Sequence, residues 1–80
     1  MSQDLERITA IVCEVGKISG INPDDDIYDA GFSSINALQL LMELESALEV
    51  SIPDDEFITA RSPRALHAMI ARLKQEQLVA

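Results

Sequence analysis

The side chains that could do chemistry in this sequence are the hydroxyls of Ser33 and Ser34, the thiol of Cys13 and the imidazole of His67. Neither Cys13 nor His67 has a partner at the spacing that nucleophilic catalysis or zinc binding requires. We therefore expect Cys13 to pack as a small core residue and His67 to lie at the surface or its boundary. The two serines stand at the start of a segment that runs to Glu49 without Gly or Pro. A serine hydroxyl in this position can cap a helix. The residue types predict no enzyme.

Aspartates crowd the segment before these serines, at residues 24–26 and at Asp29. A helix-loop-helix calcium site needs oxygen ligands at alternate positions, a glycine at the sixth and a glutamate at the twelfth. Counting from Asp24 places Asp29 sixth and Ile35 twelfth. The sequence therefore predicts a solvated acidic loop and no metal site.

The overall charge restricts the partners. Fourteen acidic against six basic residues give a formal net charge of −8, which opposes contact with nucleic acid and with anionic membrane surfaces. No apolar run reaches the roughly 18 residues that a membrane span needs, and residues 1–4 do not resemble a signal peptide. The single cysteine fits a reducing compartment. We expect a cytoplasmic monomer that meets basic protein surfaces.

A helix is predicted at the start of the chain, over residues 3–16 with Ser2 as its N-cap. Its apolar residues recur at spacings of three and four: Leu5, Ile8, Val12 and Val15. Residues 17–33 contain turn signals and are expected to form a long ordered loop. The apolar residues that would anchor this loop across the helix ends are Ile21, Ile27, Tyr28 and Phe32.

A second helix is predicted over residues 34–49, which are rich in strong helix formers, with Ser33 in the N-cap position. A short helix of one or two turns is expected at residues 53–58, because an acidic first turn follows Pro53.

The last helix is predicted to begin at Pro63, with Ser62 as its N-cap, and to end near Lys74. The fold class is then all-α: a small four-helix bundle of three main helices plus a short third one. A chain of this size forms one domain, here residues 1–80.

The second helix carries more apolar residues than a core-facing side needs. One broad side holds Leu40, Leu41, Leu44 and Leu48. A second line, which we name the outer stripe, consists of Ile35, Leu38 and Met42 and begins beside Ser34. The outer stripe either covers the long loop or, as we favour, forms a docking surface.

Residues 30–45, AGFSSINALQLLMELE, resemble the modification site of acyl carrier proteins, where Gly-X-Asp-Ser-Leu precedes an apolar, acidic helix. Residues 52–56, IPDDE, are similar to the Ile-Pro-Asp-Glu-Glu of that family. The resemblance extends over the whole chain, from the first helix to the last. It implies a carrier protein and not an enzyme.

For Ser34, the resemblance implies that a phosphopantetheinyl transferase joins phosphopantetheine from coenzyme A to its hydroxyl. The thiol of this arm would hold an acyl or aminoacyl group as a thioester. A phosphate at the first turn of a helix meets free backbone N–H groups and the positive end of the helix dipole. The alternative reading of Ser34 is an unmodified N-cap that competes with Ser33 for this role.

The positions at which this sequence differs from the acyl carrier pattern affect the partners that we expect. Ser33 replaces the usual Asp, and Asn36 and Gln39 stand where many fatty-acid carriers are acidic, so the helix is uncharged until Glu43. We therefore expect a specialised stand-alone carrier for an aminoacyl or polyketide-type group. The expected docking residues are Ser33, Ile35, Leu38, Met42 and Glu43.

The implied partners are the transferase, an acyl- or amino-acid-activating ligase and a downstream acyl-accepting enzyme. A different class of function also fits the charge and the outer stripe. An unmodified acidic helical module could bind a protein partner through the same surface, and it would not need Ser34.

Overall fold

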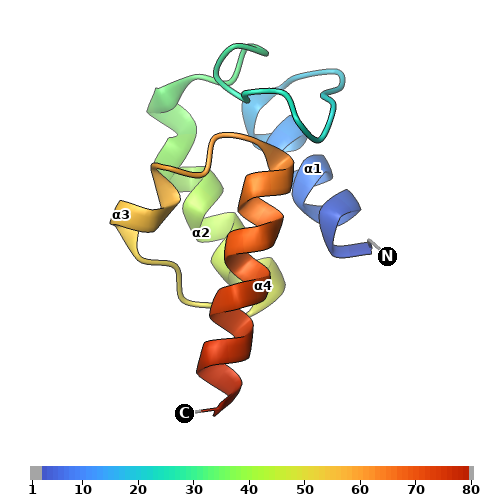
Figure 1. Cartoon of the computed structure of the whole chain (residues 1–80). Coiled ribbons are helices and arrows are strands. Elements are labelled where there is room, and N and C mark those ends of the chain that lie inside the picture. Colours follow the sequence, from blue (N-terminus) through green and yellow to red (C-terminus); the bar gives the residue numbers. More distant parts are fainter. Residues whose placement is uncertain (1–2, 80) are drawn as a thin grey trace.

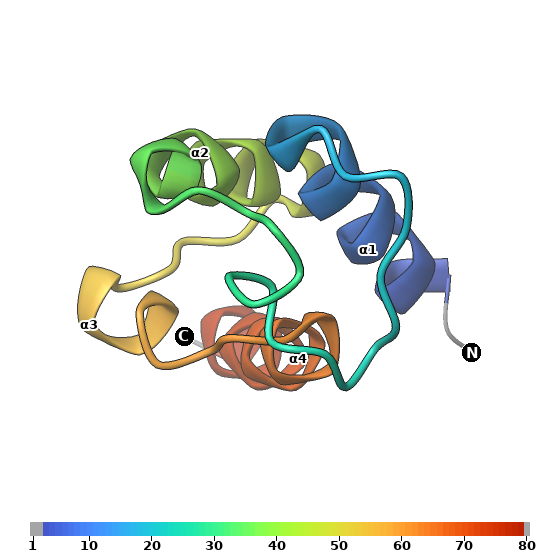
Figure 2. The same cartoon turned by 90° about the horizontal axis from the view of Figure 1, so that it is seen from above.

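Four helices surround one apolar core in the computed structural model, which describes residues 3–79 (Figure 1). In chain order they are α1 (Gln3–Gly16), α2 (Ala37–Leu48), α3 (Asp54–Phe57) and α4 (Pro63–Val79), with the 3₁₀ turn η1 (Ser34–Asn36) directly before α2. The helix α1 packs against both α2 and α4. Seen from above, the long loop that leaves α1 crosses the beginning of α4 on its way to α2 (Figure 2). The predicted all-α four-helix bundle is confirmed.

The core is formed by the helix faces that the apolar spacing predicts. Ile8 and Val12 of α1, Leu40 and Leu44 of α2 and Leu66 of α4 have no exposed surface. Each such side chain contributes about 1.5–3 kcal/mol relative to leaving it in water. The predicted range of α1, residues 3–16, is confirmed, whereas the predicted cap Ser2 lies outside the described residues.

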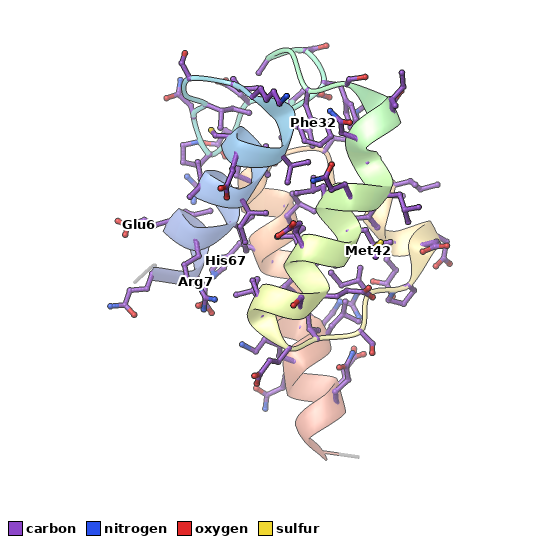
Figure 3. All side chains as sticks on the ribbon, turned by 180° about the vertical axis from the view of Figure 1, so that it is seen from behind. Glu6, Arg7, Phe32, Met42 and His67 are labelled. Atoms are coloured by element: carbon purple, nitrogen blue, oxygen red, sulfur yellow. The ribbon has the colours of Figure 1, made fainter. Side chains whose placement is uncertain are left out.

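The end of α1 is shaped by a close approach of the loop. A Cβ at Gly16 would lie 2.5 Å from Cδ2 of Phe32, so a larger residue would push the buried Phe32 ring away. Lys17 then takes a left-handed conformation with φ 57°, and the Ile18 N–H donates to the Cys13 carbonyl over 2.9 Å. The labelled Phe32 side chain lies between α1 and the start of α2 (Figure 3).

The loop is ordered, as predicted, because apolar side chains and hydrogen bonds attach it to the start of α4. Its expected anchors are buried or partly buried: Ile21, Ile27, Tyr28 and Phe32. The Ile27 N–H donates to the Arg61 carbonyl over 2.8 Å, and the Arg64 N–H donates to the Pro23 carbonyl over 2.9 Å. These hydrogen bonds thereby hold two segments that are far apart in the sequence, the loop and the start of α4, beside the first turn of α2.

Two ion pairs join the acidic loop to the arginines around the start of α4. Arg61 Nε donates to Asp26 Oδ2 over 2.7 Å, and Arg64 Nε donates to Asp24 Oδ1 over 2.6 Å. The Arg64–Asp24 pair is exposed and the Arg61–Asp26 pair is partly exposed, so each contributes little stability through charge alone. Both arginines that flank the start of α4 thus pair with carboxylates of the loop.

Replacing Asp26 with asparagine is expected to flatten the acid side of the stability profile. The hydrogen bond from Arg61 lowers the pKa of Asp26, and the N–H groups of Asp29 and Tyr28 also favour its ionised form. Because the folded pKa lies below the unfolded value of about 3.9, the stabilisation is complete above that value and is lost as pH falls through the folded pKa.

The measurement is Tm against pH from about 5 to 2, the range in which such a carboxylate titrates. Asp29→Asn is the control, because it makes the same charge change outside the ion pair. Equal acid-side slopes in wild type and Asp26→Asn would contradict the prediction.

Two helix boundaries differ from those predicted for the middle of the chain. The second helix does not begin as α-helix at Ser34, because the Asn36 N–H donates to the Ser33 carbonyl over 3.0 Å and tightens the first turn to 3₁₀. The short helix is a single turn, α3, and Ile58 is its C-cap instead of a helical residue.

The last helix is longer than predicted: α4 continues past Lys74 to Val79. Arg72 Nη1 donates to Glu76 Oε2 one turn later over 2.9 Å. Gln77 Nε2 donates to the Ser51 carbonyl over 2.8 Å, and its Oε1 accepts from the Ser51 N–H over 3.2 Å. Contacts with the segment after α2 thus support the last turns of α4.

Candidate functional site

The head of α2 assigns different roles to the two adjacent serines. Ser33 is extended, with φ −83° and ψ 134°, and its Oγ accepts a hydrogen bond from the Ile35 N–H over 3.2 Å. Ser34, the first residue of η1, is exposed. The sequence left open which of the two serines caps the start of the helix. In the structure Ser33 is the cap, and the Ser34 hydroxyl is not used for capping.

The backbone at this turn is less available to an anion than expected. The Ile35 N–H is bonded to Ser33 Oγ, and the Asn36 N–H to the Ser33 carbonyl. The sequence predicted free backbone N–H groups for a phosphate on Ser34. This prediction is wrong for the N–H groups of Ile35 and Asn36. The positive end of the helix dipole remains, and it favours an anion by an amount on the order of 0.3–1 kcal/mol.

The outer stripe is exposed along its whole length. Ile35, Leu38 and Met42 expose 89%, 65% and 59% of their surfaces. The alternative that they cover the loop is therefore wrong. Met42 lies on the side of α2 that faces away from α1 (Figure 3). A shallow groove runs along this face and is lined by Ile35, Leu38, Gln39, Met42, Glu43 and Ser46.

A second depression lies against Ser34 itself. We name it the Ser34 hollow: it has a volume of about 580 Å³ and is lined by Tyr28, Phe32, Ser34, Ala37, Ile58 and Arg61. A smaller hollow of about 210 Å³ lies between α2 and α3 and shares Ala37 and Ile58 with it. Ser34 is thus flanked by the outer stripe along α2 and by the Ser34 hollow toward the loop and α3.

The comparison with known proteins decides the family. A family model described as a phosphopantetheine attachment site matches residues 6–70.

The chain belongs to the phosphopantetheine attachment-site family.

A curated protein similar to this chain is 3-methylorcinaldehyde synthase from Phoma sp. The two are 28% identical over 67 residues, which cover 81% of this chain and 2% of the synthase. The chain therefore corresponds to a small part of that much longer protein.

As a member of the phosphopantetheine attachment-site family, the chain is a phosphopantetheine-bearing carrier, and phosphopantetheine is its covalent cofactor. The resemblance to carrier proteins is thereby confirmed. The family is not itself catalytic, and its members work with enzymes such as transferases and synthases. No helix in the described part of the chain is long and apolar enough to cross a membrane.

The head of α2 fits the cofactor that this family carries. Attachment needs a hydroxyl that a transferase can reach, and Ser34 is exposed and not engaged as the cap. The Ser34 hollow offers space beside this hydroxyl for a flexible group. Ser33 is exposed as well, but its Oγ accepts the Ile35 N–H and is thereby engaged as the cap of the turn.

Other candidates from the sequence lie elsewhere. Cys13 is partly buried in a groove between α1 and the loop, and His67 is partly buried on α4. Two of the loop aspartates pair with arginines, and no group of three or more His, Cys, Asp or Glu residues within 3–79 is placed to hold a metal ion.

Ser34 is the one residue of the Ser34 hollow that was predicted as part of the site, and the lining residues farthest from it in sequence are Tyr28, Ile58 and Arg61. Tyr28 was expected only as a loop anchor and Ile58 only as a helical residue. No local pattern connects them with Ser34, because they come from the loop and from both ends of the α3–α4 connection. Only the folded chain brings them together.

Proposed function

We propose that Ser34 is the attachment residue and that the chain carries an acyl or aminoacyl group as a thioester. The observation that supports this most is the division of roles at the head of α2, where Ser33 caps the turn and Ser34 keeps an exposed hydroxyl. Both serines lie within the matched residues 6–70. A core shared by residues from α1 to α4 supports one carrier domain over residues 1–80.

Attachment would be a phosphoryl transfer to Ser34 Oγ by a phosphopantetheinyl transferase. A base of the transferase takes the hydroxyl proton, the Oγ–P bond forms, and a P–O bond of the coenzyme A pyrophosphate breaks to release adenosine bisphosphate. Once bound, the arm supplies the terminal thiol that forms the thioester. The carrier makes no further bond, and its contribution is to deliver the cargo at high local concentration.

The docking surface proposed for the partner enzymes surrounds Ser34. It consists of Ser33, Ile35, Leu38, Met42 and Glu43. Its exposed apolar side chains fit a partner that covers them briefly. A carrier must leave each partner, so we expect interfaces at the small end, below about 1,200 Å² of total buried area.

The partners proposed after the transferase are an acyl- or amino-acid-activating ligase and an acyl-accepting enzyme. That the similar protein from Phoma sp is named a synthase supports a synthase as the accepting enzyme. Between Ser34 and Glu43 the helix carries no charge. Association should therefore depend less on salt than it would for a carrier whose helix is acidic over these residues, since electrostatic steering is what salt screens. The single cysteine supports a cytoplasmic location.

The test is the intact mass of the protein after incubation with coenzyme A and a phosphopantetheinyl transferase of broad specificity. One phosphopantetheine adduct per chain is expected, and peptide mapping should place it on Ser34. If several transferases give no adduct on the folded protein, the alternative of an unmodified interaction module is favoured, because the exposed outer stripe does not require modification.

A further inference from the structure

The Ser34 hollow contains one charged side chain, Arg61. Arg61 Nε donates to Asp26 Oδ2 over 2.7 Å, and its Nη2 donates to Asp26 Oδ1 over 3.5 Å. The guanidinium carbon lies 4.6 Å from the centre of the Tyr28 ring. The Tyr28 ring in turn meets Phe32 edge-on, with centroids 5.9 Å apart. Contacts on two sides therefore hold this guanidinium in place.

Arg61 nevertheless has donors to spare. A guanidinium carries five N–H groups, and the contacts with Asp26 use the Nε hydrogen and one hydrogen of Nη2. The Arg61 side chain is 55% exposed, so the remaining N–H groups are accessible. The other loop pair, between Arg64 and Asp24, is similar in geometry, but neither of its residues lines the hollow.

A phosphodiester on Ser34 would need a positive partner in this place. The protein already has a formal net charge of −8, and the attached group would add another negative charge. The N–H groups of Ile35 and Asn36 are bonded to Ser33 and therefore do not provide the anion site that a free helix start provides. A guanidinium binds phosphate oxygens through two parallel N–H donors.

We propose that Arg61 donates hydrogen bonds to the phosphodiester on Ser34 and holds the first part of the arm in the Ser34 hollow. This inference rests on the proposed attachment at Ser34. Tyr28 and Ile58 flank the arm there, with Ile58 65% exposed and free to cover its carbon chain. The arm leaves the head of α2 toward α3 and α4, so the outer stripe stays open for a partner while the arm is at rest.

The experiment compares the ³¹P NMR signal of the phosphopantetheine-bearing protein in wild type, Arg61→Gln and Arg64→Gln. Intact mass first establishes that each variant carries one adduct. Arg64→Gln is the matched control, because it removes the same charge and a similar aspartate pair outside the hollow. In Arg61→Gln the ³¹P shift should move toward that of the urea-unfolded protein, and in Arg64→Gln it should equal the wild-type shift.

A second measurement follows the NMR signals of Arg61 and Ile58 in the protein itself. Attachment should shift the Arg61 Nε–H signal and the Ile58 methyl signals in the wild type, and the Ile58 shift should shrink in Arg61→Gln. A folded Arg61→Gln protein with the wild-type ³¹P shift would overturn the role of Arg61 and leave the attachment at Ser34 standing. Failure of the wild type to form any adduct would overturn both proposals. If Arg61→Gln does not fold, Arg61→Lys replaces it, and an unchanged ³¹P shift there overturns the bidentate contact.

Discussion

Replacing Ser34 with alanine is expected to abolish phosphopantetheine attachment and to leave the fold intact. The substitution removes the Oγ that would form the phosphodiester, and the Oγ of the neighbouring Ser33 is engaged as the acceptor of the Ile35 N–H. Since Ser34 is exposed and is not the cap, the free energy of unfolding should change by less than about 0.5 kcal/mol. Intact mass after transferase treatment and thermal melts measure the two effects.

The adjacent serine is the matched control with the opposite expectation. Ser33→Ala should still accept one phosphopantetheine, but it loses the cap of the 3₁₀ turn, which costs about 0.5–2 kcal/mol in comparable helices. An adduct that survives in Ser34→Ala, or disappears only in Ser33→Ala, would contradict the assignment of the attachment residue.

The second large effect is expected from Leu44→Ala, which should lower the free energy of unfolding by about 2–5 kcal/mol. Leu44 has no exposed surface and lies in the centre of the core face of α2. A domain of this size has a total stability on the order of 5–10 kcal/mol. The variant should therefore lose a large share of its stability and unfold at a lower urea concentration than the wild type. Urea denaturation followed by circular dichroism measures the loss.

Leu38→Ala makes the same chemical change on the outer stripe of the same helix. Leu38 is 65% exposed, so its loss should change stability by no more than about 0.5 kcal/mol. Because Leu38 is proposed as a docking residue, however, its truncation should weaken binding to the transferase by about 1–2 kcal/mol. This lowers the kcat/KM of the transferase about 5- to 30-fold. A Leu38→Ala protein that is destabilised as much as Leu44→Ala, or modified at the wild-type rate, would contradict the separation of the two faces.

The sequence predicted most of the fold because apolar spacing on a helix directly determines which side is buried. The range of α1 follows from such spacing, and the separation of Leu44 from Leu38 on α2 follows from the same rule. The sequence also places Ser34 at the start of the second helix, and it is exposed there in the structure. Its role as the attachment residue stays a prediction. The docking role of the outer stripe stays a prediction.

What the sequence could not predict depends on contacts between distant residues. The extension of α4 is supported by Gln77 and Ser51, whose pairing has no local signature. The Ser34 hollow needs the loop, α3 and Arg61 to meet at the head of α2. The cap was ambiguous between two adjacent serines, because either hydroxyl can satisfy an N–H group of the first turn.

The placement of Tyr28 has an optical consequence. The sequence has one tyrosine and no tryptophan, so near-ultraviolet circular dichroism is dominated by a ring that lies edge-on to Phe32 and beneath Arg61. This band exists only while the ring is held in asymmetric packing, whereas the far-ultraviolet band reports helix content throughout the molecule. Near-ultraviolet circular dichroism therefore reports the order of the loop around Ser34, and far-ultraviolet circular dichroism reports the integrity of the bundle. Neither measurement needs a label.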